Sequence, residues 1–136
     1  MIRLFLVAFI SSLLISCSQK ETKRPETALD TGREFIRASL DGDFKHAETL
    51  LLKDTQNLQL FSSYKTYYQR LPEKEKQQYK TASYNINKYD ELNDSTCIIN
   101  YSNSYMKKPM DIKLVRVNNL WDVDFKFMYA VDSSAN

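Results

Sequence analysis

The chain from Ala28 to Leu51 reads "ALDTGREFIRASLDGDFKHAETLL", and its pattern sets the architecture of the helical half of the chain. Apolar and small residues recur every three to four positions, which predicts a helix with one apolar stripe. The run Asp41-Gly42-Asp43 interrupts this period. Glycine suits a left-handed turn after a helix, and aspartate suits the cap of the next one. We therefore predict two helices joined by a tight turn, the second a short helix beginning near Phe44.

The helical period continues from Thr27 to about Ala82. A third helix is predicted from apolar residues at the same spacing, and it ends at Leu71 because Pro72 disfavours helix at the residue before it. Pro72 can in turn begin another turn or two of helix that ends near Tyr79. The apolar residues of the third helix are Leu60, Phe61, Tyr64, Tyr67, Tyr68 and Leu71.

From Ser83 onward the period changes to two, which is typical of strands with one buried face. Asn93-Asp94 marks one turn, and Asn118-Asn119 is a tight hairpin signal because asparagine tolerates positive φ. Helices first and strands after predict an α+β fold, with N-terminal helices packed against one side of a curved antiparallel meander. The four strands are expected around Tyr84–Asn87, Cys97–Tyr101, Ile112–Leu114 and Trp121–Phe127.

The last predicted strand has an aromatic face and an acidic face. Trp121, Val123 and Phe125 alternate with Asp122 and Asp124. If the aromatic face packs on the helices, the two acids face water.

Two stretches together resemble the nuclear transport factor 2-like superfamily: the helical segment quoted above and the closing "NNLWDVDF" of Asn118–Phe125. More narrowly, they are similar to uncharacterised lipoprotein domains of that group in bacteria such as Bacteroidetes. The match covers about residues 27–128, with Asn118-Asn119 where many members have a glycine. The resemblance implies a cone, also described as cystatin-like, in which a strongly curved sheet of about four strands wraps the helices. Such cones often hold a pocket in the wide end.

The N-terminus carries a separate signal. The apolar run Leu4–Ile15 has twelve residues, whereas a membrane-spanning helix needs roughly 20. With Arg3 before it, the run predicts a secretory signal that is removed. Leu14-Ile15-Ser16-Cys17 resembles the bacterial lipobox, which implies cleavage between Ser16 and Cys17 and a diacylglycerol on the Cys17 thiol. An ordinary secretory signal with an incidental cysteine, and an uncleaved anchor, are the alternatives.

These signals divide the chain into residues 1–16 as signal peptide, 17–26 as lipidated cysteine and tether, 27–130 as the domain and 131–136 as a tail. A lipid on Cys17 implies an envelope protein anchored to the outer membrane, facing the periplasm or displayed on the surface. Gln19-Lys20-Glu21 faintly resembles the tags of surface-exported Bacteroidetes lipoproteins, so both addresses stay open. Cations beside a bilayer gain from anionic headgroups, and we expect this of Lys20, Lys23 and Arg24.

Charge and composition narrow the function. Without Arg3, 18 of the 19 basic residues remain against 17 acidic ones, a formal charge of +1, which indicates no nucleic acid or other polyanionic partner. Cys97 has no disulfide partner once Cys17 is lipidated, and we expect a buried, unreactive thiol. His46 is the one histidine and is expected at an exposed helix position. No His or Cys pair has metal-ligand spacing, so neither a metal nor a cofactor is predicted.

One surface position suggests modification. Asp94-Ser95-Thr96 matches the short pattern of O-glycosylation on exported Bacteroidetes proteins. The pattern falls at a predicted turn, where a glycosyltransferase could reach Ser95.

The aromatic residues are the candidate binding constellation. They could line a pocket for an apolar ligand, with tyrosine hydroxyls orienting it, or they could fill the cone completely. Tyr67 and Tyr68 are adjacent, so at most one can point squarely into the core. The candidate pocket residues are Tyr64, Tyr67, Tyr68, Tyr101, Tyr105, Trp121, Asp124 and Phe125.

The sequence thus suggests a lipid-anchored, non-catalytic binding or interaction module in the envelope, with a small apolar ligand or another envelope protein as partner. The alternative is a small-molecule-binding or cyclase/isomerase-type enzyme that would use Tyr67, Tyr101 and Asp124. Homodimerisation through the outer sheet face is a further hypothesis, implied by the family resemblance.

Overall fold

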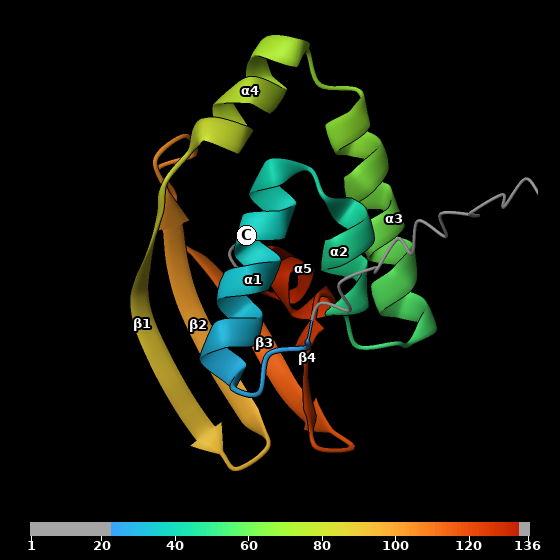
Figure 1. Cartoon of the computed structure of the whole chain (residues 1–136), viewed down its shortest axis with the longest axis vertical. Coiled ribbons are helices and arrows are strands. Elements are labelled where there is room, and N and C mark those ends of the chain that lie inside the picture. The colour runs from blue at the N-terminus through green and yellow to red at the C-terminus, as the bar shows by residue number, and fades with distance from the viewer. Residues whose placement is uncertain (1–22, 134–136) are drawn as a thin grey trace, which may run out of the picture.

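A computed structural model of the chain describes residues 23–133, and it confirms the α+β class with a four-stranded antiparallel sheet (Figure 1). The signal peptide, Ser16, Cys17, Lys20 and the export-tag residues lie outside the described residues. The elements are α1 (Ala28–Asp41), α2 (Phe44–Thr49), α3 (Thr55–Gln69), α4 (Glu73–Thr81), β1 (Tyr84–Asn93), β2 (Thr96–Asn103), β3 (Met110–Val117), β4 (Leu120–Asp124) and α5 (Lys126–Ser133).

The predicted turn between the first two helices is confirmed. Gly42 follows α1 with φ 74°, a left-handed conformation that glycine adopts without a steric cost. Asp43 caps α2, its side chain accepting a hydrogen bond from the His46 N–H at 3.1 Å. The chain therefore reverses within two residues and packs α2 against α1.

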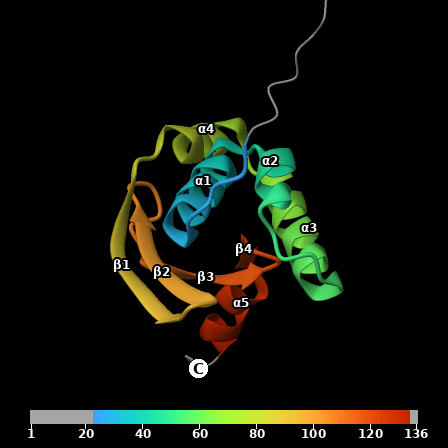
Figure 2. The ribbon, with the colours of Figure 1, turned by 60° about the horizontal axis from the view of Figure 1, so that its bottom comes forward.

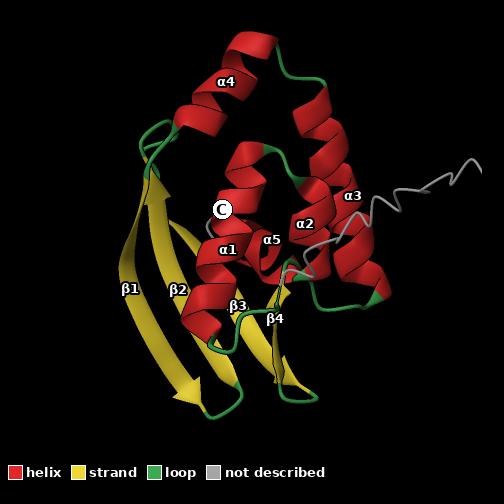
Figure 3. Ribbon diagram, in the orientation of Figure 1, coloured by secondary structure: helices red, strands yellow, loops and turns green. Residues whose placement is uncertain are grey.

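The strands form a meander in the order β1-β2-β3-β4. Asn118 and Asn119 turn the β3–β4 hairpin with φ 50° and 63°, as the sequence predicts. Figure 2 shows the sheet curving around α1, and Figure 3 shows the four strands on one side with α1 to α4 on the other.

The α2–α3 connection covers the free edge of β4. Val123 N–H donates to the Leu50 carbonyl at 2.8 Å, and Leu52 N–H donates to the Val123 carbonyl at 3.0 Å. These bonds form a short parallel bridge at Leu51. The edge is thus paired with the helical layer rather than left open for another strand.

Helix α1 lies very close to the sheet because Gly32 has no side chain. A Cβ at that position would lie 2.4 Å from Ile99 Cδ1. Phe35 and Ile36 continue the same buried face one turn later, with 2% and 1% exposure. This face of α1 and the inner face of β2 and β3 form the centre of the core.

The predicted end of the last strand is wrong. β4 stops at Asp124, and α5 begins at Lys126 instead of the strand continuing to Phe127. The Lys126 N–H donates to Asn57 Oδ1 at 2.8 Å, so a residue of α3 receives the chain as it leaves the sheet. Helix α5 then runs through Ser133, past the boundary at residue 130 where the tail is expected to begin.

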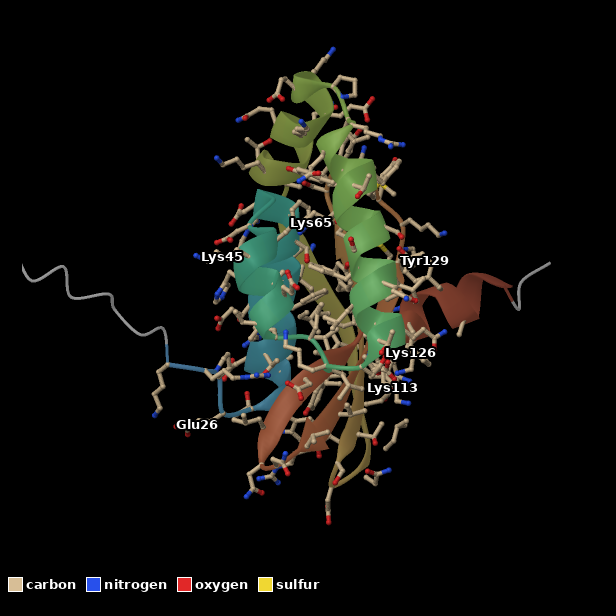
Figure 4. The ribbon with its side chains drawn as sticks, turned by 90° about the vertical axis from the view of Figure 1, so that its right-hand side faces the viewer. Glu26, Lys45, Lys65, Lys113, Lys126 and Tyr129 are labelled. Atoms are coloured by element: carbon tan, nitrogen blue, oxygen red, sulfur yellow. The ribbon has the colours of Figure 1, made fainter. Side chains whose placement is uncertain are left out.

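The expectation that Asp124 faces water is also wrong. Asp124 is 7% exposed, and its Oδ1 accepts from Asn57 Nδ2 at 3.3 Å and lies 3.0 Å from Lys126 Nζ. Lys113 Nζ lies 3.7 Å from Oδ2. Asp54 joins the same group through Lys126 Nζ at 2.8 Å. We call these five residues the α3–α5 network; Lys113 and Lys126 meet at the lower end of α3 in Figure 4.

Arg24 is bound to the domain, although the sequence places it in the tether beside the lipid headgroups. Its guanidinium donates to the Thr49 carbonyl at 3.0 Å and the Trp121 carbonyl at 2.7 Å, and it pairs with the Asp122 carboxylate. Asp122 is therefore partly buried by Arg24 rather than fully in water. Arg24, three residues before the predicted boundary at residue 27, is therefore in contact with the domain.

Candidate ligand cavity

A cavity of about 340 Å³ lies beside the end of β4. β3 pairs with β4 only from Lys113 onward, so Met110–Ile112 extend past the end of the shorter strand. Side chains of α1, α3 and α5 line this space together with side chains of α4, β2 and β3. We call it the aromatic cavity. Its wall includes Phe35, Ile36, Ser39, Leu40, Tyr64, Tyr67, Tyr79, Tyr101, Asn103, Met110, Phe125, Met128 and Tyr129.

A tightly packed aromatic cluster borders the aromatic cavity. Phe125 lies 5.3 Å from Phe61 and 5.7 Å from Tyr64, measured between ring centroids. Phe35 completes the contact at 6.2 Å from Phe125. Phe35, Tyr64 and Phe125 thus line the aromatic cavity, and the same rings pack on Phe61 in the buried core.

The polar groups in the cavity wall are mostly uncharged. Burial, followed by the neighbouring Tyr101, raises the pKa of Tyr64 far above its ordinary value. Burial also raises the pKa of Tyr101 to about 12, with a smaller contribution from Tyr79. Both phenols therefore keep their protons at neutral pH and can donate hydrogen bonds.

Several of these groups lack a strong partner in the protein. Ser39 Oγ is buried and makes no hydrogen bond to the described residues. The Tyr101 hydroxyl has only the Met110 sulfur, 3.9 Å away, and a thioether is a weak acceptor. In contrast, Asn103 Oδ1 accepts from the backbone N–H groups of Tyr105 and Met106 at 3.1 and 2.8 Å.

Three large apolar side chains border the mouth of the aromatic cavity, together with the exposed Lys108. Tyr67, Met106 and Tyr129 are 59%, 45% and 42% exposed, and all three border the cavity. Figure 4 shows Tyr129 on α5, beside α3. The mouth is thus ringed by large side chains that soluble proteins more often bury, which is typical of a binding entrance.

The structure brings four of the predicted pocket residues to the cavity wall: Tyr64, Tyr67, Tyr101 and Phe125. The adjacent tyrosines divide as expected, since Tyr68 is 8% exposed in the core and Tyr67 lies at the mouth.

The other predicted pocket residues lie elsewhere. Tyr68 packs on Phe44 at 4.9 Å, and Tyr105 packs on Tyr79 at 4.7 Å. Trp121 lies in register with Arg116, whose guanidinium sits 6.0 Å from its ring. Asp124 belongs to the α3–α5 network.

Sequence patterns alone missed Ser39, Tyr79, Met110 and the α5 residues of the wall. Ser39 follows Phe35 and Ile36 by one turn on the buried face of α1, so its helical position was a usable signal. Met128 and Tyr129 could not be placed, because the last strand was expected to run to Phe127 and no helix was predicted after it.

Charged groups stay at the border of the aromatic cavity. Asp111 follows Met110 in β3, and its carboxylate accepts from Asn100 Nδ2 at 2.6 Å. Asn100 and Asp111 pair across the strands, one residue away from the inward-facing Ile99 and Ile112, so both side chains point to the outer face of the sheet.

His46 lies on α2 and does not line the aromatic cavity. Its Nε2 is 2.5 Å from Oε1 of Glu34 on α1. The exposed helix position expected for His46 is only partly exposed, since its side chain is 28% exposed. Residues 23–133 contain no cluster of three or more potential metal ligands.

Cys97 is buried as predicted, with its sulfur 3.4 Å from the Tyr89 hydroxyl. Ser95 is exposed in the β1–β2 turn, and its glycosylation remains a prediction.

Within the described part of the chain, no helix is long and apolar enough to cross a membrane. No protein-family description, curated protein or solved structure matches the chain.

Proposed function

We propose that this protein is a lipid-anchored, non-catalytic binding module of the bacterial envelope, and that the aromatic cavity holds a small, largely apolar ligand. The observation that carries the proposal is the cavity itself. Its volume of about 340 Å³ lies at the lower end of the range of about 300 to 1,000 Å³ that is usual for small-molecule sites. Aromatic and aliphatic walls with a few hydroxyl groups favour an apolar ligand held in one orientation.

We also propose that the domain is a nuclear transport factor 2-like cone. Helices that precede a four-stranded meander, the curvature of the sheet around α1 and a hollow at one end of the helical layer support this assignment. Homodimerisation through the outer face stays a hypothesis.

A cyclase or isomerase is less well supported than a binding module. Such an enzyme needs a carboxylate or other base within reach of its substrate. Asp124, the acid of that hypothesis, is held by Asn57 and Lys126 outside the aromatic cavity. Asp111 borders the cavity with its carboxylate bound to Asn100.

The contacts of Arg24 support a short tether. Arg24 lies seven positions after Cys17, the proposed lipid site, and it is fixed to the domain by Asp122 and two backbone carbonyls. A fully extended chain of that length spans about 25 Å. An anchored domain would therefore stay close to the bilayer.

The anchor and the ligand site have separate tests. Cys17→Ser should abolish palmitate labelling in cells, and unchanged labelling would refute the lipid anchor. For the site, naphthalene is titrated into the detergent-solubilised full chain by calorimetry, with the heat of detergent alone subtracted. We expect saturable binding that Met128→Trp removes by filling the cavity. Leu92→Trp, which adds the same side chain at an exposed strand position, should leave binding intact.

A further inference from the structure

We propose that the ligand of the aromatic cavity is an uncharged molecule with a hydrogen-bond acceptor such as a carbonyl oxygen, and that Ser39 and Tyr64 donate to this acceptor. The inference rests on the proposed ligand site and adds the chemical class of the ligand.

Ser39 is the first observation. It lines the aromatic cavity, and its Oγ is buried with no hydrogen-bond partner among residues 23–133. Native proteins pair nearly all buried hydroxyls, because an unpaired one loses its water without replacement. A serine in a helix often bonds back to the carbonyl four residues earlier, and Ser39 does not. Its hydroxyl is therefore available to a molecule in the cavity.

Tyr64 is the second observation and comes from a different element. Its ring packs on Phe44 at 5.7 Å and on Phe125 at 5.7 Å, which fixes its orientation, while no hydrogen bond to its hydroxyl is found in the described part of the chain. Tyr101 lines the same cavity from β2, and its hydroxyl has only the Met110 sulfur at 3.9 Å. Helices α1 and α3 and strand β2 thus each present a hydroxyl to the aromatic cavity.

The charge of the ligand depends on the surroundings of these hydroxyls. An ion that enters an apolar cavity loses its hydration, and it needs an opposite charge in compensation. The charged residues that border the cavity are Lys108, which is exposed, and Asp111, whose carboxylate is bound to Asn100. The cavity interior therefore favours a neutral acceptor over a carboxylate, a phosphate or an ammonium group.

Three ligands that share one naphthalene ring system test this inference by calorimetry on the detergent-solubilised full chain. They are naphthalene, 2-acetylnaphthalene and 2-naphthoate, which carry no acceptor, a neutral acceptor and an anion. We expect the ketone to bind roughly three- to tenfold more tightly than naphthalene, as one added hydrogen bond allows, and the anion to bind most weakly. Equal binding of ketone and naphthalene, or tightest binding of naphthoate, would overturn the inference while leaving the ligand site intact. No binding of any of the three would refute the proposed function itself.

Variants of Ser39 and Tyr64 test which hydroxyl donates the proposed hydrogen bond to the ligand. Ser39→Ala and Tyr64→Phe should each lower the preference for the ketone over naphthalene, and Ser63→Ala on the exposed face of α3 should leave it unchanged. Without ligand, Ser39→Ala should unfold at the same temperature as the original protein or higher, because it removes an unpaired buried hydroxyl. A lower melting temperature with an unchanged ketone preference would show that Ser39 serves the fold instead.

Discussion

The α3–α5 network and the aromatic cavity are adjacent at Phe125, and they differ in how their polar groups are hydrogen-bonded. Asp124 and Lys126, its neighbours in the chain, join the α3–α5 network, in which each carboxylate has a lysine or an amide partner. The ring of Phe125 instead lines the aromatic cavity, where Ser39 Oγ has no hydrogen-bond partner in the described chain.

The difference separates a region whose polar groups pair with one another from a region whose hydroxyls remain for the proposed ligand. Asn57 is fully buried, and its amide donates to Asp54 and Asp124 while its oxygen accepts from the Lys126 backbone. Such a saturated group has no capacity left for a ligand. The hydroxyls of the aromatic cavity keep that capacity, at some cost to stability.

The largest effect is expected where the two regions share a wall. Phe125→Ala removes a side chain with 2% exposure that contacts Phe35, Phe61 and Tyr64. We expect a loss of about 3–5 kcal/mol in the free energy of unfolding, measured by urea denaturation. Phe127→Ala, two residues later and half-buried, should cost less than half as much. Equal losses would mean that the wall between the regions has no special role in stability.

The next effect tests the saturated region. Asn57→Ala leaves the Lys126 N–H and the Asp124 carboxylate without their buried partner, and we expect a loss of about 2–3 kcal/mol in the free energy of unfolding. Asn85→Ala, an exposed asparagine on β1, is the matched control and should change stability by less than about 0.5 kcal/mol. If the two variants denature alike, the network does not stabilise the fold.

A smaller effect isolates the charge within the same network. Hydrogen bonds from Lys126 and from the Asn57 backbone lower the pKa of Asp54 below the ordinary value of 3.8. A lowered folded pKa contributes stability that is present above pH 3.8 and is lost as the pH falls through the folded value. Asp54→Asn keeps the helix cap but not the titration. Its melting temperature should therefore fall less than that of the original protein between about pH 5 and pH 2.5.

Asp43→Asn is the control for that comparison. Asp43 also caps a helix, α2, and has no ion pair among the described residues. An Asp54→Asn curve that coincides with the Asp43→Asn curve would contradict the assigned role of Lys126.

Local patterns predicted the parts of the fold that depend on neighbouring residues. Gly42 and Asn118-Asn119 supply the positive φ values that their turns require, and the change of period near Ser83 separates helices from strands. The end of β4 could not be predicted from neighbouring residues. The Lys126 N–H, just after the strand, donates to Asn57, and Asn57 lies 69 positions earlier in the chain.

The residues of the candidate site likewise include some that local patterns predicted and some that they did not. The tyrosine spacing on α3 was sufficient to place Tyr64 and Tyr67 at a pocket. Asp124 was misplaced because strand alternation alone puts it on an outer face, whereas Lys113, Lys126 and Asn57 cover that position from other elements. Contacts between distant segments, and the hollow left where β4 stops, are properties of the assembled fold.

The smallest expected effect on stability compares two tyrosine hydroxyls on one sheet, one in the aromatic cavity and one already hydrogen-bonded within the fold. This pair tests most directly whether hydroxyls of the cavity are left unpaired by the fold. The Tyr101 hydroxyl has only the Met110 sulfur at 3.9 Å, whereas the Tyr89 hydroxyl donates to Glu91 Oε1 at 3.0 Å and contacts the Cys97 sulfur at 3.4 Å. Tyr101→Phe should change the free energy of unfolding by less than about 0.5 kcal/mol, and Tyr89→Phe should lower it by about 0.5–1.5 kcal/mol. Urea denaturation of both variants measures the difference. A larger loss at Tyr101 would mean that the fold already uses its hydroxyl, and the aromatic cavity would then have one donor fewer to offer a ligand.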